Sequence, residues 1–88
     1  MWILELAFDP PDHPDRMARR PAHRELLKQF HAEGVVPYAG PMADGATGIV
    51  LWDLPDEASV HEYMARDPYY ESPGVTVAGL RRWDTLPL

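Results

Sequence analysis

The segment WILELAF, residues 2–8, decides the fold, because its side chains alternate like those of a β-strand covered on one face. Side chains two apart lie on the same face of a strand. One face therefore carries four large apolar groups, Trp2, Leu4, Leu6 and Phe8. The other face carries Ile3, Glu5 and Ala7. This pattern predicts a sheet whose larger apolar face is covered by helices.

Two helices are predicted downstream of this strand. The first covers residues 20–34, and Pro21 is well suited to open it because a proline fits the first helical turn. Residues 12–20 are predicted to be a loop or a short helical turn. The second helix begins within residues 53–57 and ends before the Asp67-Pro68 pair, since the residue before a proline disfavours helical geometry.

Three further strands complete the predicted sheet. Residues 35–40 and 46–54 form a hairpin, joined by a loop at 41–45 that contains Pro and Asp-Gly. Residues 74–83 form the last strand. The order strand, helix, strand, strand, helix, strand predicts an α+β, ferredoxin-like fold: a four-stranded antiparallel sheet with both helices on one face.

Length and composition limit the number of domains and argue against several classes of partner and site. Eighty-eight residues predict a single domain spanning 1–88, and the absence of cysteine excludes disulfides, thiolate zinc sites and cysteine nucleophiles. Eight basic and fourteen acidic residues give a net charge of −6, which argues against nucleic-acid and membrane partners. The chain has neither a membrane-spanning apolar run nor the basic start of a signal peptide. We therefore expect a cytoplasmic protein with a small-molecule ligand.

The second face of the sheet predicts a partner subunit. If the helices cover the face of Leu4, then Ile3, Ala7 and one side of residues 49–52 remain uncovered on the other face. An apolar face of this kind is typical of an interface, and a chain this short gains stability from a second core. A two-fold contact between two such sheets would supply that core, so we expect a homodimer.

His23 and Asp67 are the candidate chemical pair. On a helical wheel, His23 lies in the middle of the apolar stripe that Leu26, Leu27 and Phe30 form. If the apolar stripe of the second helix is continued beyond the last turn, Asp67 falls on it. Because both helices pack on one face of the sheet, we expect the imidazole and the carboxylate to meet. Such a pair suits general acid–base chemistry near neutral pH.

Each member of this pair also has a structural interpretation. A histidine on an apolar face is often a core residue that bonds a backbone carbonyl. Asp67 precedes Pro68, and an Asp-Pro pair commonly opens a turn in which the carboxylate accepts from nearby backbone N–H groups. Only the coincidence of the two residues favours function.

The remaining polar and aromatic candidates are weaker. His13, His31 and His61 lack the close spacing of metal ligands, so no metal site is predicted. Basic residues cluster at Arg16, Arg19, Arg20 and Arg24, either as a solvated face or as a site for an anionic substrate group. Arg20 lies three residues before His23 and is the preferred substrate-binding residue. Tyr69 and Tyr70 are either pocket-lining or packing residues.

Several short strings, taken in order, resemble the YCII-related (YciI-like) family. They are Arg20-Pro21-Ala22-His23, Glu33-Gly34, Ala39-Gly40-Pro41-Met42 and Asp67-Pro68-Tyr69, with Gly74-Val75 downstream. Each string is short, but their order and spacing are specific, and the resemblance runs from the first strand to Trp83.

The resemblance implies a ferredoxin-like domain that pairs into a dimeric α/β barrel, with His23 and Asp67 as the catalytic pair. Gly40, which lies within one of the matching strings, is predicted to bind substrate together with Arg20 and Tyr70. Relatives suggest an isomerase, lyase or dehydrochlorinase-like enzyme that needs no cofactor, and the alternative is a non-catalytic binding or accessory module. The short loop at 41–45 and Arg24 after His23 depart from the family pattern, which bears on pocket shape.

Overall fold

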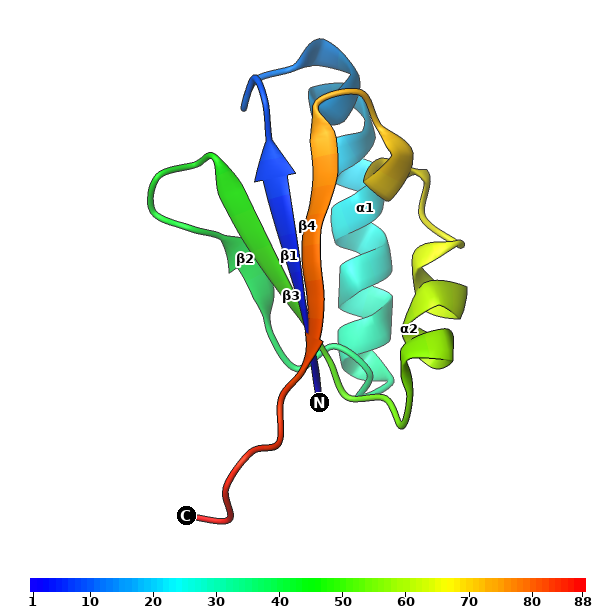
Figure 1. Cartoon of the computed structure of the whole chain (residues 1–88). Helices are drawn as coiled ribbons and strands as arrows, with labels where there is room; N and C mark the ends of the chain where they lie inside the picture. The colour runs from blue at the N-terminus through cyan, green and yellow to red at the C-terminus, as the bar shows by residue number, and fades with distance from the viewer.

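The computed structural model describes residues 1–88 and contains four strands, two α-helices and one short 3₁₀ helix (Figure 1). In chain order these are β1 (Trp2–Phe8), α1 (Pro14–Ala32), β2 (Ala39–Pro41), β3 (Thr47–Trp52), α2 (Glu57–Met64), the 3₁₀ helix η1 (Pro68–Glu71) and β4 (Val75–Arg82). No helix is both long enough and apolar enough to cross a membrane.

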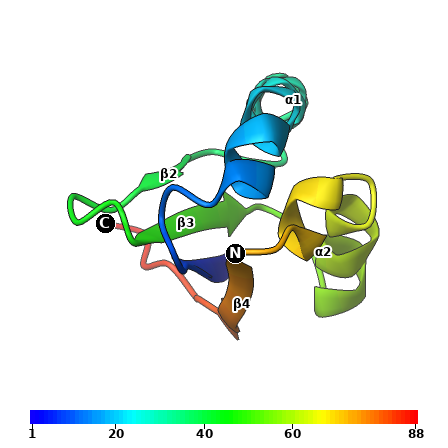
Figure 2. The ribbon, with the colours of Figure 1, turned by 90° about the horizontal axis from the view of Figure 1, so that it is seen from above.

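The strands form one antiparallel sheet in the order β2-β3-β1-β4, with β1 between β3 and β4. Both α-helices lie on the same face of this sheet (Figures 1 and 2). The predicted ferredoxin-like α+β arrangement is confirmed, and the sheet of a single chain is open rather than closed into a barrel.

The core forms where the alternating strand faces meet the helices. Leu4 pairs with Val50 across β1 and β3, and both are buried together with Trp52. On the opposite face Ile3 pairs with Leu51, and both are only partly buried. The period-two pattern of β1 thus assigned its two faces correctly.

The start of the first helix was predicted wrongly. α1 begins at Pro14 rather than near Pro21, and the side chain of His13 caps it by accepting the N–H of Asp15. Pro21 lies inside the helix, where it has no N–H to donate to the preceding turn. Side chains from the turns before this proline, Arg16 and Arg19, bond to η1 and its flank, so tertiary contacts hold the part of the helix that the sequence left in a loop or short turn.

Other boundaries moved by smaller amounts. β2 is only three residues long, because the chain before it is held by different bonds: Val35 donates to Phe30 and accepts from Asp53. α2 begins at Glu57, capped by Asp56, whose carboxylate accepts the N–H of Ser59. The 3₁₀ helix η1 was not predicted, and it proves important for the site.

Candidate functional site

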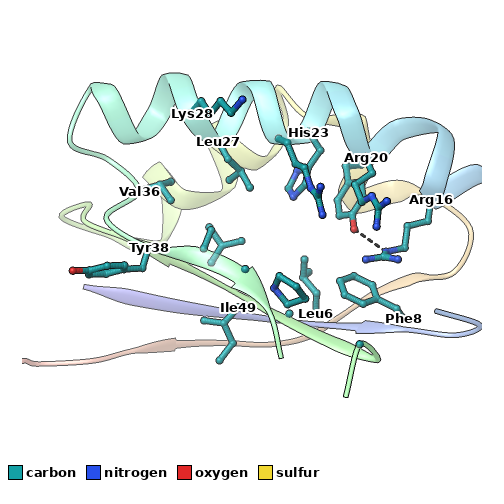
Figure 3. Close-up of a pocket in the computed structure, with 18 of the residues that line it drawn as sticks. Leu6, Phe8, Arg16, Arg20, His23, Leu27, Lys28, Val36, Tyr38 and Ile49 are labelled. Atoms are coloured by element: carbon teal, nitrogen blue, oxygen red, sulfur yellow. Dashed lines mark hydrogen bonds between the residues drawn. The ribbon is translucent and has the colours of Figure 1, made fainter. Parts of the chain in front are cut away.

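A cleft of about 770 Å³ opens between α1 and the β2–β3 side of the sheet (Figure 3). Apolar side chains of the sheet, including Leu6, Phe8 and Val50, form much of its floor. Arg16, Arg20 and His23 reach into it from α1, as Figure 3 shows. The cleft therefore combines apolar walls with a polar group of side chains from one helix, as small-molecule sites do.

His23 and Asp67 meet at one wall of this cleft. The imidazole Nδ1 lies 2.6 Å from Asp67 Oδ2, and the two residues are only 7% and 4% exposed. An ionised carboxylate can only accept a hydrogen bond, so Nδ1 carries the hydrogen atom and donates the hydrogen bond to Asp67. That assignment leaves the lone pair on Nε2.

The free nitrogen of His23 is accessible from the cleft. Nε2 makes no hydrogen bond within the chain, and the only fully buried side-chain polar atoms without a partner are Trp52 Nε1 and Tyr70 OH. Because His23 lines the cleft, Nε2 is the atom that a ligand would meet.

Asp67 is positioned by the turn that follows α2. As the N-cap of η1 it accepts the N–H of Tyr69 on Oδ1, at 3.0 Å, while Oδ2 accepts from His23. Asp67 therefore makes both of the predicted contacts, the local turn bond through Oδ1 and the contact with His23 through Oδ2. The structural interpretation of His23 expected a bond to a backbone carbonyl, but its partner is the carboxylate of Asp67. His31 is the histidine that bonds a backbone carbonyl, that of Val36.

Tyr69 is the most connected side chain of the site. Its ring stacks on the His23 imidazole with 3.8 Å between centroids and 9° between planes. Its hydroxyl accepts a 2.8 Å hydrogen bond from Arg16 Nε. It thus fixes the plane of the imidazole and the position of a guanidinium at once.

Arg16 is the second buried ionic group of the cleft, at 6% exposed. Besides Tyr69, it donates to the carbonyl of Pro11 and lies 3.7 Å above the ring of Phe8. None of these neighbours is negatively charged, so the charge of Arg16 is not neutralised within the chain.

The other predicted substrate-binding residues lie in different places. Arg20 and Gly40 line the cleft, from α1 and from β2. Tyr70 does not line it. Tyr70 is buried behind the pair, with its ring edge-on to His23 at 5.5 Å. Burial, followed by the nearby charge of Asp67, raises the pKa of Tyr70 well above its usual value.

Two contributions escaped the sequence reasoning. Arg16 was predicted to lie in a loop or short turn and was named only as part of a basic cluster, whereas it is a fixed residue of α1. Tyr70 was predicted to bind substrate in place of Tyr69, whereas Tyr69 is the tyrosine that lines the cleft. The signal available for both was their place beside other candidates, two turns before His23 and two residues after Asp67.

The three other histidines each have a partner of their own in the structure. His13 caps α1, His31 bonds Val36, and His61 pairs with Glu57 on α2. No three His, Asp or Glu side chains gather as ligands for one ion.

Comparison with known families matches residues 1–84 to the YCII-related domain. A search of the curated proteins found no match. The family match over residues 1–84 covers all the elements of the fold and every residue of the site described above.

Proposed function

This chain belongs to the YCII-related family, and from that premise we propose that it is a small-molecule enzyme in which His23 transfers a proton. The observation that carries the proposal is the geometry of one imidazole. Nδ1 is tied to Asp67 at 2.6 Å, and Nε2 is free at the cleft. Side chains held in this way act as general bases and acids.

In this proposal His23 Nε2 takes a proton from a substrate atom in the cleft, and the substrate keeps the electron pair of the broken bond. Asp67 holds the ring in one tautomer and stabilises the imidazolium that forms. Return of the proton to a different substrate atom gives an isomerisation, and its delivery to a leaving group gives an elimination. Either reaction balances without a cofactor.

The alternative is a non-catalytic module that binds a small molecule. It is favoured by one specific observation, namely that Asp67 also caps η1 and is nearly fully buried. In that case the pair would serve as a polar anchor between α1 and the turn after α2.

A ligand screen followed by product analysis separates these functions. Thermal-shift screening of the protein against metabolite mixtures identifies ligands, and each ligand is then incubated and analysed for product. The enzyme proposal expects conversion by the wild type and by His61→Gln, whose histidine is exposed on α2, but not by His23→Gln. Binding without conversion of any ligand would favour the binding module.

We also propose that the working form is a homodimer joined through the uncovered face of the sheet. Ile3, Ala7, Ile49 and Leu51 are partly exposed on that face in a single chain. Figure 3 shows Ile49 on the opposite side of the sheet from α1. Partly exposed apolar side chains that share one face of a sheet are typical of an interface.

A further inference from the structure

We propose that the cleft is built for a small organic carboxylate, whose carboxylate group binds Arg16 and Arg20 while the proton-exchanging atom lies at His23 Nε2. This inference names the substrate class of the proposed enzyme and so rests on the proposed function. It starts from a buried cation that has no anion beside it.

The partners of Arg16 fix its position without neutralising it. The Tyr69 hydroxyl, the Pro11 carbonyl and the Phe8 ring are all uncharged, and no carboxylate lies within ion-pair distance of this guanidinium. Removing an arginine from water is unfavourable unless its charge is compensated. A ligand carboxylate would supply that compensation, and its attraction to the guanidinium is stronger in the cleft than in water.

Arg16 is the innermost member of a row of cations. Arg16, Arg20, Arg24 and Lys28 follow one another at intervals of four along α1, and all four line the cleft. Like charges at this spacing destabilise a helix. Lys28 pairs with Glu25, but Arg20 and Arg24 have no carboxylate partner. Asp12 is the one acidic residue of the cleft lining, and it is exposed and forms no ion pair.

The charge of the cleft is thus opposite to that of the chain. The protein carries a net charge of −6, whereas the cleft lining carries four cations and one anion. The lining of the cleft therefore favours an anion over a cation, although the chain as a whole is acidic.

The apolar floor of the cleft favours an organic carboxylate over inorganic phosphate. A guanidinium binds either anion with two parallel hydrogen bonds. Leu6, Phe8 and Val50, however, offer an apolar surface that only a ligand with an organic body would cover. Figure 3 shows Arg16, Arg20 and His23 in succession along one side of α1, all directed into the cleft. A ligand held by the two arginines would therefore present a neighbouring atom to His23.

The test compares anions with neutral molecules of the same shape. Benzoate, phenylacetate and glutarate are each titrated against the corresponding amide, with inorganic phosphate as a further probe, by calorimetry and by NMR shifts of the full chain. We expect at least one carboxylate to bind tenfold or more tighter than its amide, and tighter than phosphate. Equal binding of all three acids and amides, or tighter binding of phosphate, would overturn the inference.

Matched variants assign the binding to the cleft. Arg20→Gln and Arg16→Met should each weaken carboxylate binding about tenfold or more. Arg19→Gln should not, because Arg19 bonds the Pro68 carbonyl and Ser72 Oγ outside the cleft. Should Arg16→Met fail to fold, Arg20→Gln decides alone, since Arg20 has no hydrogen bond within the chain. Carboxylate affinity unchanged in Arg20→Gln contradicts the inference.

His23→Gln distinguishes this inference from the proposed function. It should retain the carboxylate preference, because the arginines make the contacts. Carboxylates that bind but are never converted would contradict the enzyme proposal and leave the inference standing. Turnover that depends on His23 but occurs only with neutral substrates would support the enzyme proposal and contradict the carboxylate inference.

Discussion

At the scale of single residues, Tyr69 joins the acid–base pair to the cationic part of the cleft. Its N–H binds Asp67, its ring stacks on His23, and its hydroxyl accepts from Arg16. One residue of a four-residue helix therefore contacts three ionisable groups from two distant parts of the chain, two through its side chain and one through its backbone N–H. This arrangement makes the site testable by conservative substitutions that remove one contact each.

Asp67→Asn should reduce turnover of an identified substrate by about 10²–10⁴-fold in kcat, with a much smaller change in KM. The amide oxygen can still accept the Tyr69 N–H, so the cap and the fold are retained, but the negative charge beside His23 is lost. Steady-state kinetics on the folded variant measure both constants. Asp56→Asn, the matching change at the cap of α2, should leave kcat unchanged. An Asp67→Asn enzyme with normal kcat would show that Asp67 does not position the base.

Tyr69→Phe should lower the free energy of unfolding by about 1–3 kcal/mol, because the buried Arg16 Nε loses its acceptor while the stacked ring remains. Urea denaturation measures the loss. Tyr38→Phe is the control, since Tyr38 is 76% exposed and its hydroxyl makes no hydrogen bond. Equal stability of the two variants would mean that the Arg16 contact contributes nothing.

Tyr70→Phe should leave stability at pH 7 unchanged or slightly raised, because the buried hydroxyl has no hydrogen-bond partner to lose. Burial raises the pKa of Tyr70 above its usual value of 10.0. As pH rises above about 10, the unfolded chain loses this proton and the folded chain keeps it. The contribution of Tyr70 to the free energy of unfolding therefore falls by about 1.4 kcal/mol for each pH unit above 10.

Urea titrations at several alkaline pH values test this behaviour. The Tyr70→Phe protein should lose stability less steeply above pH 10 than the wild type does. A variant that is markedly destabilised at pH 7 would instead reveal a partner for the hydroxyl, such as a buried water.

At the scale of elements, the start of α1 is packed against the turn into β4. Gly74 has φ +86°, and a Cβ there would lie 2.6 Å from Cβ of His13, the cap of α1. Gly34, just after the end of α1, has φ +80° but open space around it. The two glycines thus share a backbone conformation and differ in their surroundings.

Alanine substitutions at these positions separate conformation from contact. Gly34→Ala should cost about 1–2 kcal/mol, the typical penalty for a left-handed L-residue. Gly74→Ala should cost about 1–3 kcal/mol more, because the new methyl group displaces His13 and with it the cap. Chemical denaturation gives both values, and equal losses would argue against a tight junction between α1 and β4.

At the scale of the whole molecule, the open sheet face predicts self-association. Alternation along β3 buries Val50 under the helices and leaves Leu51 on the opposite face, so Leu51 is the residue that faces a partner. Light scattering at micromolar concentration should give twice the chain mass of 10.0 kDa. Leu51→Lys should give monomers or aggregates, whereas Glu62→Lys, exposed on α2, should not. A stable wild-type monomer would contradict the dimer.

The faces of the elements and their order follow from the amino-acid pattern alone. The alternation in residues 2–8 and the helical stripe around His23 report how each side chain points relative to its own backbone, which is a local property. The ferredoxin-like order, the buried position of His23 and the meeting with Asp67 followed from those directions. The family resemblance then rested on strings placed along the same elements.

The side chains that complete the site are set by long-range packing, which the amino-acid pattern does not reveal. The bonds of the first turns of α1 to η1, the place of Tyr69 rather than Tyr70 in the cleft lining, and the neutral surroundings of Arg16 all depend on contacts between segments far apart in the chain. Arg16 and Tyr69 are 53 positions apart, and their bond exists because helix packing brings the two elements together. Periodicity fixes a direction within one element, whereas a contact between elements depends on how side chains of particular size and charge pack in three dimensions.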